Sequence, residues 1–408
     1  MSSDLLATLD PASPGACRRK PTQVDAHERL DPNDPAIPYA GRVDMSGLHW
    51  QWRARPKATI AAAIALLLGC GPASQPTWDD IDFAFISLPA GADAEPRIYG
   101  GDSISESVRE LSSEQRVTST TIAWHRDGAS VLCAAPVDGK SQRAGDWALW
   151  SVDVEGSLSL AELDASYASV TSVGAMTPSP SRRTLLIEAG TSEHVGVSGT
   201  GRHLLRVDLE TADPEATSVD LWPDGAAPTW SGDRSFAATF ADVTYEDDWT
   251  PVYGPRGIYT HDANTDEIAY PDIQTEADER SPAFSPDGSV LAYASDASGR
   301  DEIMLWPVAG GPATSIGAAP CAPTRLWWLP EGQGLLVGCD TEFAVIDRQG
   351  RAVLPARPGT PRDLAPDGRR VLLELTVDAE LHVAVFDLGD RSTVDLGPGR
   401  APVWRPMR

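Results

Sequence analysis

Residues 281–311 read SPAFSPDGSVLAYASDASGRDEIMLWPVAGG, and this stretch decides the fold. A short apolar run that ends at Phe284 meets the turn SPDG at 285–288, and a β-prone run follows at 290–293. A third apolar run, 303–308, comes after a polar loop. Aspartate and glycine suit the turn because they tolerate positive φ angles. Short strands separated by proline, aspartate and glycine therefore predict antiparallel hairpins.

The same unit recurs along the chain, with an aromatic or apolar residue before each turn. The copies open at Trp124, Pro178, Trp230, Phe284, Trp328, Leu364 and Trp404. Each of the first six is followed by a β-prone run and then by a third predicted strand. Repeats of roughly 40 to 50 residues are typical of propeller blades with four strands each.

These copies resemble the repeat of the TolB-like β-propeller family, which has an aromatic residue, then Ser-Pro-Asp-Gly, a strand and a later Ile-centred strand. The resemblance covers most of residues 80–406. It is specific in the copy at Phe284 and degraded in the copies at Pro178 and Trp328. It implies an all-β propeller. Members of the family resemble periplasmic scaffolds that bind partners, or appendages of peptidases, so the family does not imply one activity.

Seven repeat starts favour seven blades, with six as the alternative. Residues 401–404 would be left as an innermost strand without a blade of their own. Residues 83–88, 97–99 and 107–111 can complete that blade. Strands from the two ends of the chain would then close the ring within one blade, and the pairing would remove exposed sheet edges.

The first 70 residues have the pattern of a leader. Residues 1–44 are polar and proline-rich, which indicates either a disordered extension or a wrongly assigned start codon upstream of Met45. Residues 45–70 hold a basic segment, an apolar run too short to span a bilayer comfortably, and the sequence LLGC ending at Cys70. That ending resembles a bacterial lipobox. The alternative is a short buried helix, or an uncleaved membrane helix, with an incidental cysteine.

The resemblance to a lipobox implies that Cys70 is lipidated and becomes the mature N-terminus. Residues 71–80 would then be a linker, and 81–408 the propeller. No aspartate follows Cys70, so by resemblance to enteric sorting rules we expect the periplasmic face of the bacterial outer membrane. Attached acyl chains would hold the protein there stably.

The chain is strongly acidic, with a formal net charge of −26. Binding to nucleic acid depends on basic residues that contact phosphates. We therefore expect no nucleic-acid partner, and we expect a monomer that binds a protein or an envelope ligand.

Three predicted loops, 134–146, 188–202 and 241–256, are longer than their counterparts in later repeats, and long loops on a rigid scaffold are common binding sites. The third combines acidic and aromatic residues, which predicts a protein-binding patch, a weak cation site or a solvated loop. The candidates are Asp242, Tyr245, Glu246, Asp247, Asp248, Trp249 and Tyr253. Calcium-loop spacing is absent and the histidines are scattered, so we expect no metal and no cofactor.

Cys321 and Cys339 flank a predicted hairpin, at positions that lie opposite each other. In an oxidising periplasm they would form a disulfide worth roughly 3 kcal/mol, and the alternative is two reduced neighbours. Cys133 falls in a predicted strand as a buried thiol.

Two hypotheses of function remain open. The favoured one is a membrane-anchored, non-enzymatic propeller that binds its ligand through the loop face, because the sequence shows no catalytic constellation. The alternative is an envelope hydrolase or lyase with an acidic site at the propeller mouth. The second requires charged side chains that converge there.

Overall fold

The computed structural model describes most of the chain between Ile81 and Pro406. The described residues are 81–88, 96–103, 107–111, 121–125, 127–136, 147–153, 156–165, 168–193, 200–211, 214, 216–218, 226–245, 251–263 and 265–406. The predicted leader, with Cys70, lies outside them. Within the described part, no helix is long and apolar enough to cross a membrane.

Four antiparallel sheets each consist of four strands that are consecutive in the sequence. Their strands are β4 (Ile122–Trp124), β5 (Val131–Pro136), β6 (Trp147–Asp153) and β7 (Gly156–Glu162); β13 (Ala226–Ser231), β14 (Ser235–Tyr245), β15 (Pro251–Asp262) and β16 (Glu267–Ala269); β17 (Glu279–Phe284), β18 (Val290–Ser295), β19 (Glu302–Pro307) and β20 (Thr314–Ala318); and β21 (Arg325–Trp328), β22 (Gly334–Gly338), β23 (Glu342–Asp347) and β24 (Ala352–Pro358). The predicted repeat therefore forms one sheet per copy in these four regions.

A fifth sheet has five strands in the order β12-β11-β10-β9-β8. They are β8 (Asp164–Ala165), β9 (Ala168–Pro178), β10 (Thr184–Glu193), β11 (Thr200–Asp208) and β12 (Ala216–Ser218). Strand β9 continues to the repeat start at Pro178, so this sheet corresponds to the copy that opens there.

The last sheet joins the two ends of the described chain. Its order is β25-β26-β27-β28-β1-β2-β3. The strands are β25 (Thr360–Leu364), β26 (Arg370–Val377), β27 (Glu380–Asp387), β28 (Thr393–Trp404), β1 (Phe83–Ser87), β2 (Arg97–Asp102) and β3 (Ser107–Glu110). The first half of β28 pairs with β27, and the second half pairs with β1, where Trp404 lies opposite Phe83. This is the pairing that the sequence predicts between residues 83–88 and 401–404.

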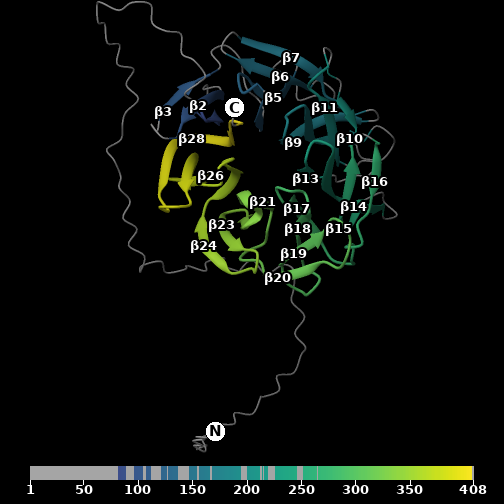
Figure 1. Ribbon diagram of the computed structural model, residues 1–408. Coiled ribbons are helices and arrows are strands. Elements are labelled where there is room, and N and C mark those ends of the chain that lie inside the picture. Colours follow the sequence, from purple (N-terminus) through teal and green to yellow (C-terminus); the bar gives the residue numbers. More distant parts are fainter. Residues whose placement is uncertain are drawn as a thin grey trace, which may run out of the picture. The chain divides into compact units, whose positions relative to one another are not determined.

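The sheets lie side by side around a central opening (Figure 1). Strands β9, β13, β17 and β21 lie nearest the centre, and β3, β7, β16, β20 and β24 lie toward the outside. These four sheets thus contribute to the wall of the opening the strand that ends at the repeat start.

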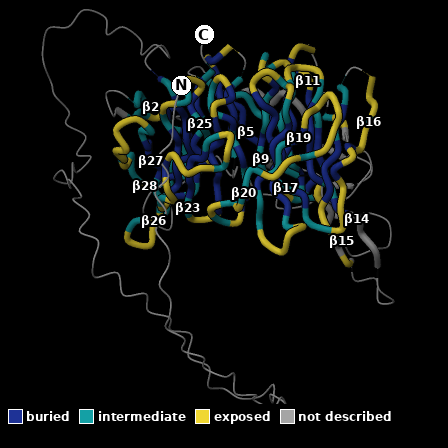
Figure 2. Tube along the Cα trace, turned by 60° about the horizontal axis from the view of Figure 1, so that its bottom comes forward, coloured by how far each residue is buried: buried dark blue, intermediate teal, exposed yellow. Residues whose placement is uncertain are grey.

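The hydrophobic core lies between neighbouring sheets, and exposed residues gather at the loops (Figure 2). One cluster joins Leu132 and Leu149 of the β4–β7 sheet to Leu185 and Leu205 of the next sheet, and all four are fully buried. Burying such side chains contributes about 1.5 to 3 kcal/mol each. Burial of these apolar side chains between neighbouring sheets therefore stabilises the packing of one sheet on the next.

The repeated turn is stabilised by its own side chains. In the copy at Phe284, the Asp287 carboxylate accepts hydrogen bonds from Ser285 Oγ at 2.6 Å and from the Ser289 amide at 3.1 Å. These bonds lower the pKa of Asp287 to about 2. Gly288 follows with a φ of +70°, which an L-residue adopts only at a cost. The aspartate and the glycine therefore have separate structural roles in the turn.

Candidate functional site

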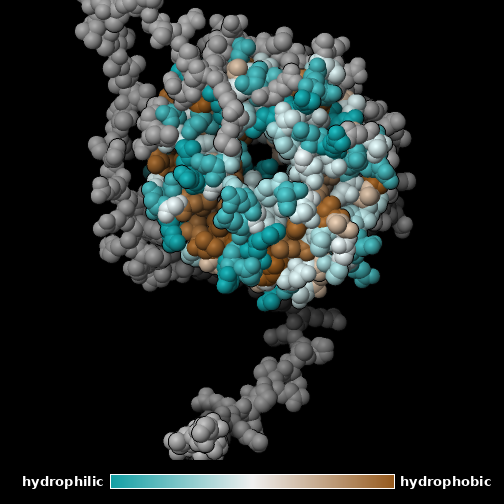
Figure 3. Space-filling model, in the orientation of Figure 1, coloured by the Kyte–Doolittle hydropathy of each residue, from teal (hydrophilic) through white to brown (hydrophobic). Residues whose placement is uncertain are grey.

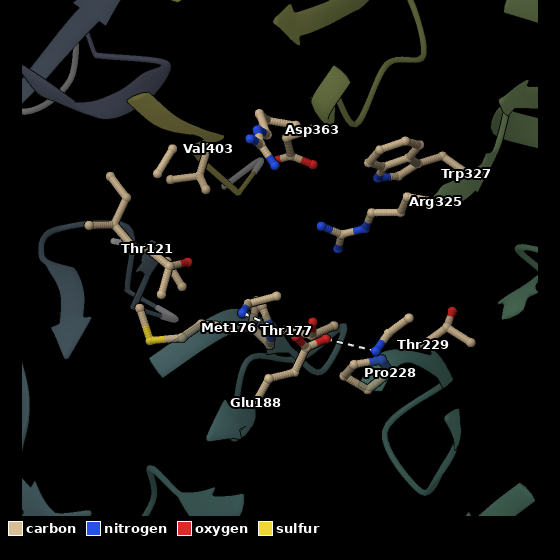
Figure 4. Close-up of a pocket in the computed structure, with 18 of the residues that line it drawn as sticks. Thr121, Met176, Thr177, Glu188, Pro228, Thr229, Arg325, Trp327, Asp363 and Val403 are labelled. Atoms are coloured by element: carbon tan, nitrogen blue, oxygen red, sulfur yellow. Dashed lines mark hydrogen bonds between the residues drawn. The ribbon is translucent and has the colours of Figure 1, made fainter. Parts of the chain in front are cut away.

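A cavity of about 750 Å³ lies at the centre, within the size range of pockets that bind small molecules. The innermost strands β4, β9, β13, β17, β21, β25 and β28 line it. Figure 3 shows the opening bordered mainly by hydrophilic residues. In Figure 4, Arg325, Asp363 and Glu188 point toward the same space from three different sheets. We call this cavity the central channel.

Three innermost strands carry a β-bulge in which a residue with positive φ precedes a proline. The residues are Ala227, Ser281 and Ala401, with φ angles of 50°, 56° and 50°. The register of the sheet shifts at each of these sites. A bulge takes a backbone amide out of the sheet ladder, and a buried amide then needs another acceptor.

Two glutamates supply that acceptor for two of the bulges. Glu188 Oε1 accepts a hydrogen bond from the Ala227 amide at 2.7 Å, and Glu374 Oε1 accepts one from the Ala401 amide at 2.6 Å. The other oxygen of Glu374 forms an ion pair with Arg362 at 2.5 Å. Glu188 holds the innermost strand of the neighbouring sheet, and Glu374 in β26 holds the second half of β28 within the seven-stranded sheet. Both carboxylates are therefore occupied by structural contacts.

The third carboxylate of the channel is Asp363 in β25. Its Oδ2 accepts a hydrogen bond from the Trp404 amide at 2.8 Å. Burial raises the pKa of Asp363 above its usual value, while the Trp404 amide and the charges of Arg325 and Arg182 act in the opposite direction. The half-buried carboxylate thus has two arginines near it.

Arg182 occupies the place of the turn glycine in the copy at Pro178. Its amide donates to the Ser179 carbonyl, as the Gly288 amide donates to the Ser285 carbonyl, and its φ is +56°. A non-glycine residue in this region stores roughly 1 to 3 kcal/mol of strain. The guanidinium lines the channel and donates to the Trp124 carbonyl at 3.0 Å. Burial lowers its pKa.

Arg325 begins β21 and lies over the Trp327 ring, with 5.0 Å from Cζ to the ring centroid. Its guanidinium points into the open part of the channel (Figure 4). Among the described residues, no hydrogen bond or ion pair holds this guanidinium. Burial lowers the pKa of Arg325, and Asp363 and Glu188 act against that shift through their charges. The channel therefore contains a cation whose donors remain available.

Charge in the channel differs in sign from charge on the whole chain. The described lining holds four arginines and three carboxylates, namely Arg182, Arg325, Arg362, Arg400, Glu188, Asp363 and Glu374. The chain as a whole has a formal net charge of −26. Low-dielectric walls concentrate such a local field, so the channel favours an anionic group.

The repeated tryptophans hold neighbouring sheets together, as predicted. Trp124 Nε1 donates to the Val403 carbonyl at 3.3 Å, and Trp328 Nε1 donates to the Ala283 carbonyl at 2.9 Å. In each case the acceptor is in the innermost strand of the adjacent sheet. Trp230 makes the corresponding bond to Thr177 at 3.1 Å. These rings belong to the core and are not exposed stacking platforms.

The predicted acidic-aromatic loop is shorter than expected. Asp242 and Tyr245 lie in β14 and Tyr253 lies in β15, because the hairpin pairing continues as far as Tyr245 opposite Pro251. The runs VTY at 243–245 and VY at 252–253 consist of residue types that favour strands. Glu246, Asp247, Asp248 and Trp249 lie outside the described residues. The loop predicted at 188–202 is also shorter, since β10 reaches Glu193 and β11 begins at Thr200.

Cys321 and Cys339 are joined by a disulfide in the structure, with 6.3 Å between their Cα atoms. Cys321 precedes β21, and Cys339 directly follows β22, so the bond lies next to the strand that begins with Arg325. Cys133 is a buried free thiol, and burial raises its pKa to about 12.

Metal ligands do not converge in the described part of the chain, where no group of three His, Cys, Asp or Glu side chains could hold an ion. No histidine lines the described walls of the channel. The polar groups available there are guanidinium and carboxylate groups.

The residues that meet in the channel are not the site residues that the sequence predicts. One available signal was an arginine in the glycine position of a repeat, at Arg182. Another was a glutamate six residues after the last residue of the turn, at Glu188 and Glu374, where the copy at Phe284 has Ala294. Nothing in the sequence indicated that Arg325 and Asp363 would come together.

Comparisons with known proteins give no match by sequence and many by structure. No protein-family model matches the chain, and no curated protein matches it. An oligogalacturonate lyase from Vibrio parahaemolyticus is similar, with a TM-score of 0.54 and 13% identity over 78% of this chain and 89% of that one. A puromycin-hydrolyzing peptidase from Mycobacterium tuberculosis has a TM-score of 0.53 and 13% identity over 81% and 56% of the two chains.

TolB from Acinetobacter baumannii is also similar, with 14% identity over 80% of this chain and 83% of that one and a TM-score of 0.46. At these identities the similarities concern the fold alone. The arrangement of antiparallel sheets around a channel defines the class of protein, an all-β propeller. TolB structures are among those to which this chain is similar.

Proposed function

We propose that this protein is a lipid-anchored β-propeller of the bacterial cell envelope, which binds a protein or envelope ligand and catalyses no reaction. In this proposal Cys70 carries the anchor on the periplasmic face of the outer membrane. The propeller is a monomer, and its ligand reaches the central channel across the face that carries the β14–β15 hairpin.

The proposal includes seven blades. Strand β28 serves two of them, because Thr393–Pro398 pairs with β27 and Gly399–Trp404 pairs with β1. Counting β28 twice divides the seven-stranded sheet into two four-stranded blades. The other five sheets supply one blade each.

The observation that carries the proposal is the state of the charged groups in the channel. Glu188 and Glu374 are occupied by the amides of Ala227 and Ala401, so they are poorly placed to exchange protons with a substrate. Arg325 has available donors, but a guanidinium stays protonated in proteins. A group of this kind suits binding better than general acid–base catalysis.

Intact-mass analysis of protein extracted from the membranes of a host that processes lipoproteins tests the anchor. A mature chain that starts at Cys70 and carries acyl chains is expected. An unmodified chain that starts at Met1 would contradict the anchor and the location in the envelope.

The alternative function is an envelope hydrolase or lyase. It is favoured by Asp363, a carboxylate of raised pKa that faces two arginines, since shifted pKa values gather at catalytic sites. Incubating the protein with polyuronates and dipeptides, and following the products by mass spectrometry, discriminates the two functions. Multiple turnovers that disappear in Asp363→Asn would establish the enzyme and contradict the binding protein.

A further inference from the structure

Arg325 is the one channel arginine for which the described structure supplies a stacking surface and no acceptor. The Trp327 ring restricts the side chain at 5.0 Å, and the guanidinium extends past it into open space (Figure 4). By contrast, Arg362 forms an ion pair with Glu374, and Arg182 donates a hydrogen bond to the Trp124 carbonyl. A guanidinium offers its donors as a planar fork that matches a carboxylate. This half-buried guanidinium has no acceptor in the described protein, and an anionic ligand would supply one through charge-assisted hydrogen bonds.

Asp363 restricts which anions fit. It attracts Arg325, yet the two groups form no ion pair within the described structure, so space remains between them. Asp363 already accepts a bond from the Trp404 amide, and an ionised carboxylate can accept several more. A ligand that offers only negative charge would be repelled by this carboxylate. A ligand that also carries hydroxyl or ammonium donors could contact both groups.

Arg182 adds a second, independent observation at the same channel. Its backbone holds a φ of +56° in a turn where the equivalent residue Gly288 has +70°. Glycine would fit this turn without strain, so the arginine is not explained by the turn itself. Its guanidinium reaches the wall near Trp124 and interacts through its charge with Asp363. Strain of this kind is typical of residues that contribute to a functional site.

We propose that the central channel binds a small organic acid that also carries hydroxyl or ammonium groups. Its carboxylate pairs with the Arg325 guanidinium, its donors face Asp363, and Arg182 supplies further positive charge. A volume of about 750 Å³ admits a ligand of the size of a monosaccharide acid or a dipeptide. This inference rests on the proposed function, because it names the ligand class for the same channel.

Isothermal titration calorimetry of the full-length protein in detergent tests the inference. The probes are D-glucuronate and L-alanyl-L-alanine, which distinguish a sugar acid from a peptide as the source of the carboxylate. Their controls are D-glucose and L-alanyl-L-alanine amide, which lack the carboxylate. Acetate tests whether a carboxylate without neighbouring donors is enough.

The variants are Arg325→Gln and the matched control Arg351→Gln. Arg351 belongs to the same sheet, at the β23–β24 turn, where its side chain is 76% exposed and pairs with Asp347. We expect one molecule of glucuronate or dialanine to bind per chain, and Arg325→Gln to weaken it at least tenfold. Arg351→Gln should leave the affinity unchanged. Because Arg325 has no protein acceptor, its replacement should also leave the unfolding temperature unchanged or higher, so lost binding will not reflect misfolding.

Three results would overturn the inference. They are no binding of either acid at millimolar concentration, equal affinity of an acid and its uncharged counterpart, or equal affinity of Arg325→Gln and the parent. Equal affinity for acetate would overturn the role of Asp363. The proposed function fails by a different measurement, because the mass of the mature chain and the assay for products do not depend on Arg325.

Discussion

Two turns of the propeller have the same backbone and different residues at the critical position. In the copy at Phe284 the turn ends with Gly288, at a φ of +70°. In the copy at Pro178 it ends with Arg182, at +56°. Both amides donate to the carbonyl three residues earlier. The fold therefore requires the same turn conformation at both sites but not the same residue. The second turn keeps the geometry with a residue that is strained there and that faces the channel.

The comparison extends to the other degraded copy, at Trp328. Arg325 lies at the start of its innermost strand, and Cys321 and Cys339 flank its first hairpin. The copy at Phe284 contributes to the same channel only Ser281 and Pro282. The copy at Phe284 thus supplies no charge to the channel, whereas the two degraded copies supply Arg182, Glu188 and Arg325, and the sheet that contains β25 supplies the other charged side chains.

Removing the disulfide of the degraded copy at Trp328 should have the largest effect on stability. Replacing both Cys321 and Cys339 with serine should lower the free energy of unfolding by about 3 kcal/mol, because the unfolded chain gains freedom. Urea unfolding measures this. Adding dithiothreitol to the parent should lower its stability to that of the variant. Two additional titratable thiols in the native, untreated parent would contradict the bond.

Glu374→Ala gives β26 the residue type that β18 has at the equivalent position, Ala294. We nevertheless expect a loss of about 2 kcal/mol, because the Ala401 amide and Arg362 lose their acceptor. Glu380→Ala, an exposed site in β27, is the control and should change stability by less than about 0.5 kcal/mol. Equal stability of both variants in urea would show that the bulge needs no carboxylate.

Exchanging the two turn residues tests the comparison itself. Arg182→Gly should raise stability by about 1 kcal/mol, since the strain is relieved and water can reach the Trp124 carbonyl. Gly288→Arg should lower stability by about 1 to 2 kcal/mol, because a Cβ there would come within 2.7 Å of Ser231 Oγ at a positive φ. Thermal unfolding measures both. Opposite signs support the account, and a loss of stability in both variants would contradict it.

The smallest effect is a difference in pH dependence between two aspartates. The pKa of Asp287 is lowered to about 2, so its contribution to stability is present above pH 4 and disappears as the pH falls toward 2. The pKa of Asp363 is raised above 3.8, so stability falls as the pH rises from 3.8 through that pKa. Unfolding of Asp287→Asn and Asp363→Asn between pH 2 and 6 measures both. Each replacement should remove its own slope, and slopes of the same sign would contradict the assignment.

Much of the fold follows from local sequence. The turn residues 285–288 and the tryptophan positions fix where strands start, and the pairing of β1 with β28 follows from an unpaired final repeat. The lengths of β14 and β15 were not predicted, because Asp242 and the other polar residues there resembled a loop. Tertiary pairing outweighed composition in that hairpin.

The channel was harder to predict. A repeat pattern identifies residues that match it, and the copy at Pro178, which contains Arg182, was recognised only as degraded. Arg362 lies at a bulge that changes the direction of side chains, and sequence periodicity does not show where a bulge falls. Arg325 and Asp363 face the same part of the channel from two neighbouring sheets, and their approach depends on how those sheets pack against each other.

Modification of arginine with phenylglyoxal, mapped by mass spectrometry, tests most directly whether Arg325 offers available donors to an anion. We expect Arg325 to react faster than Arg182, which donates to Trp124, and D-glucuronate or L-alanyl-L-alanine to protect it. Exposed Arg351 should react equally with and without either acid. An Arg325 that stays unmodified while Arg351 reacts fully, or that reacts equally in the presence of both acids, would contradict the account.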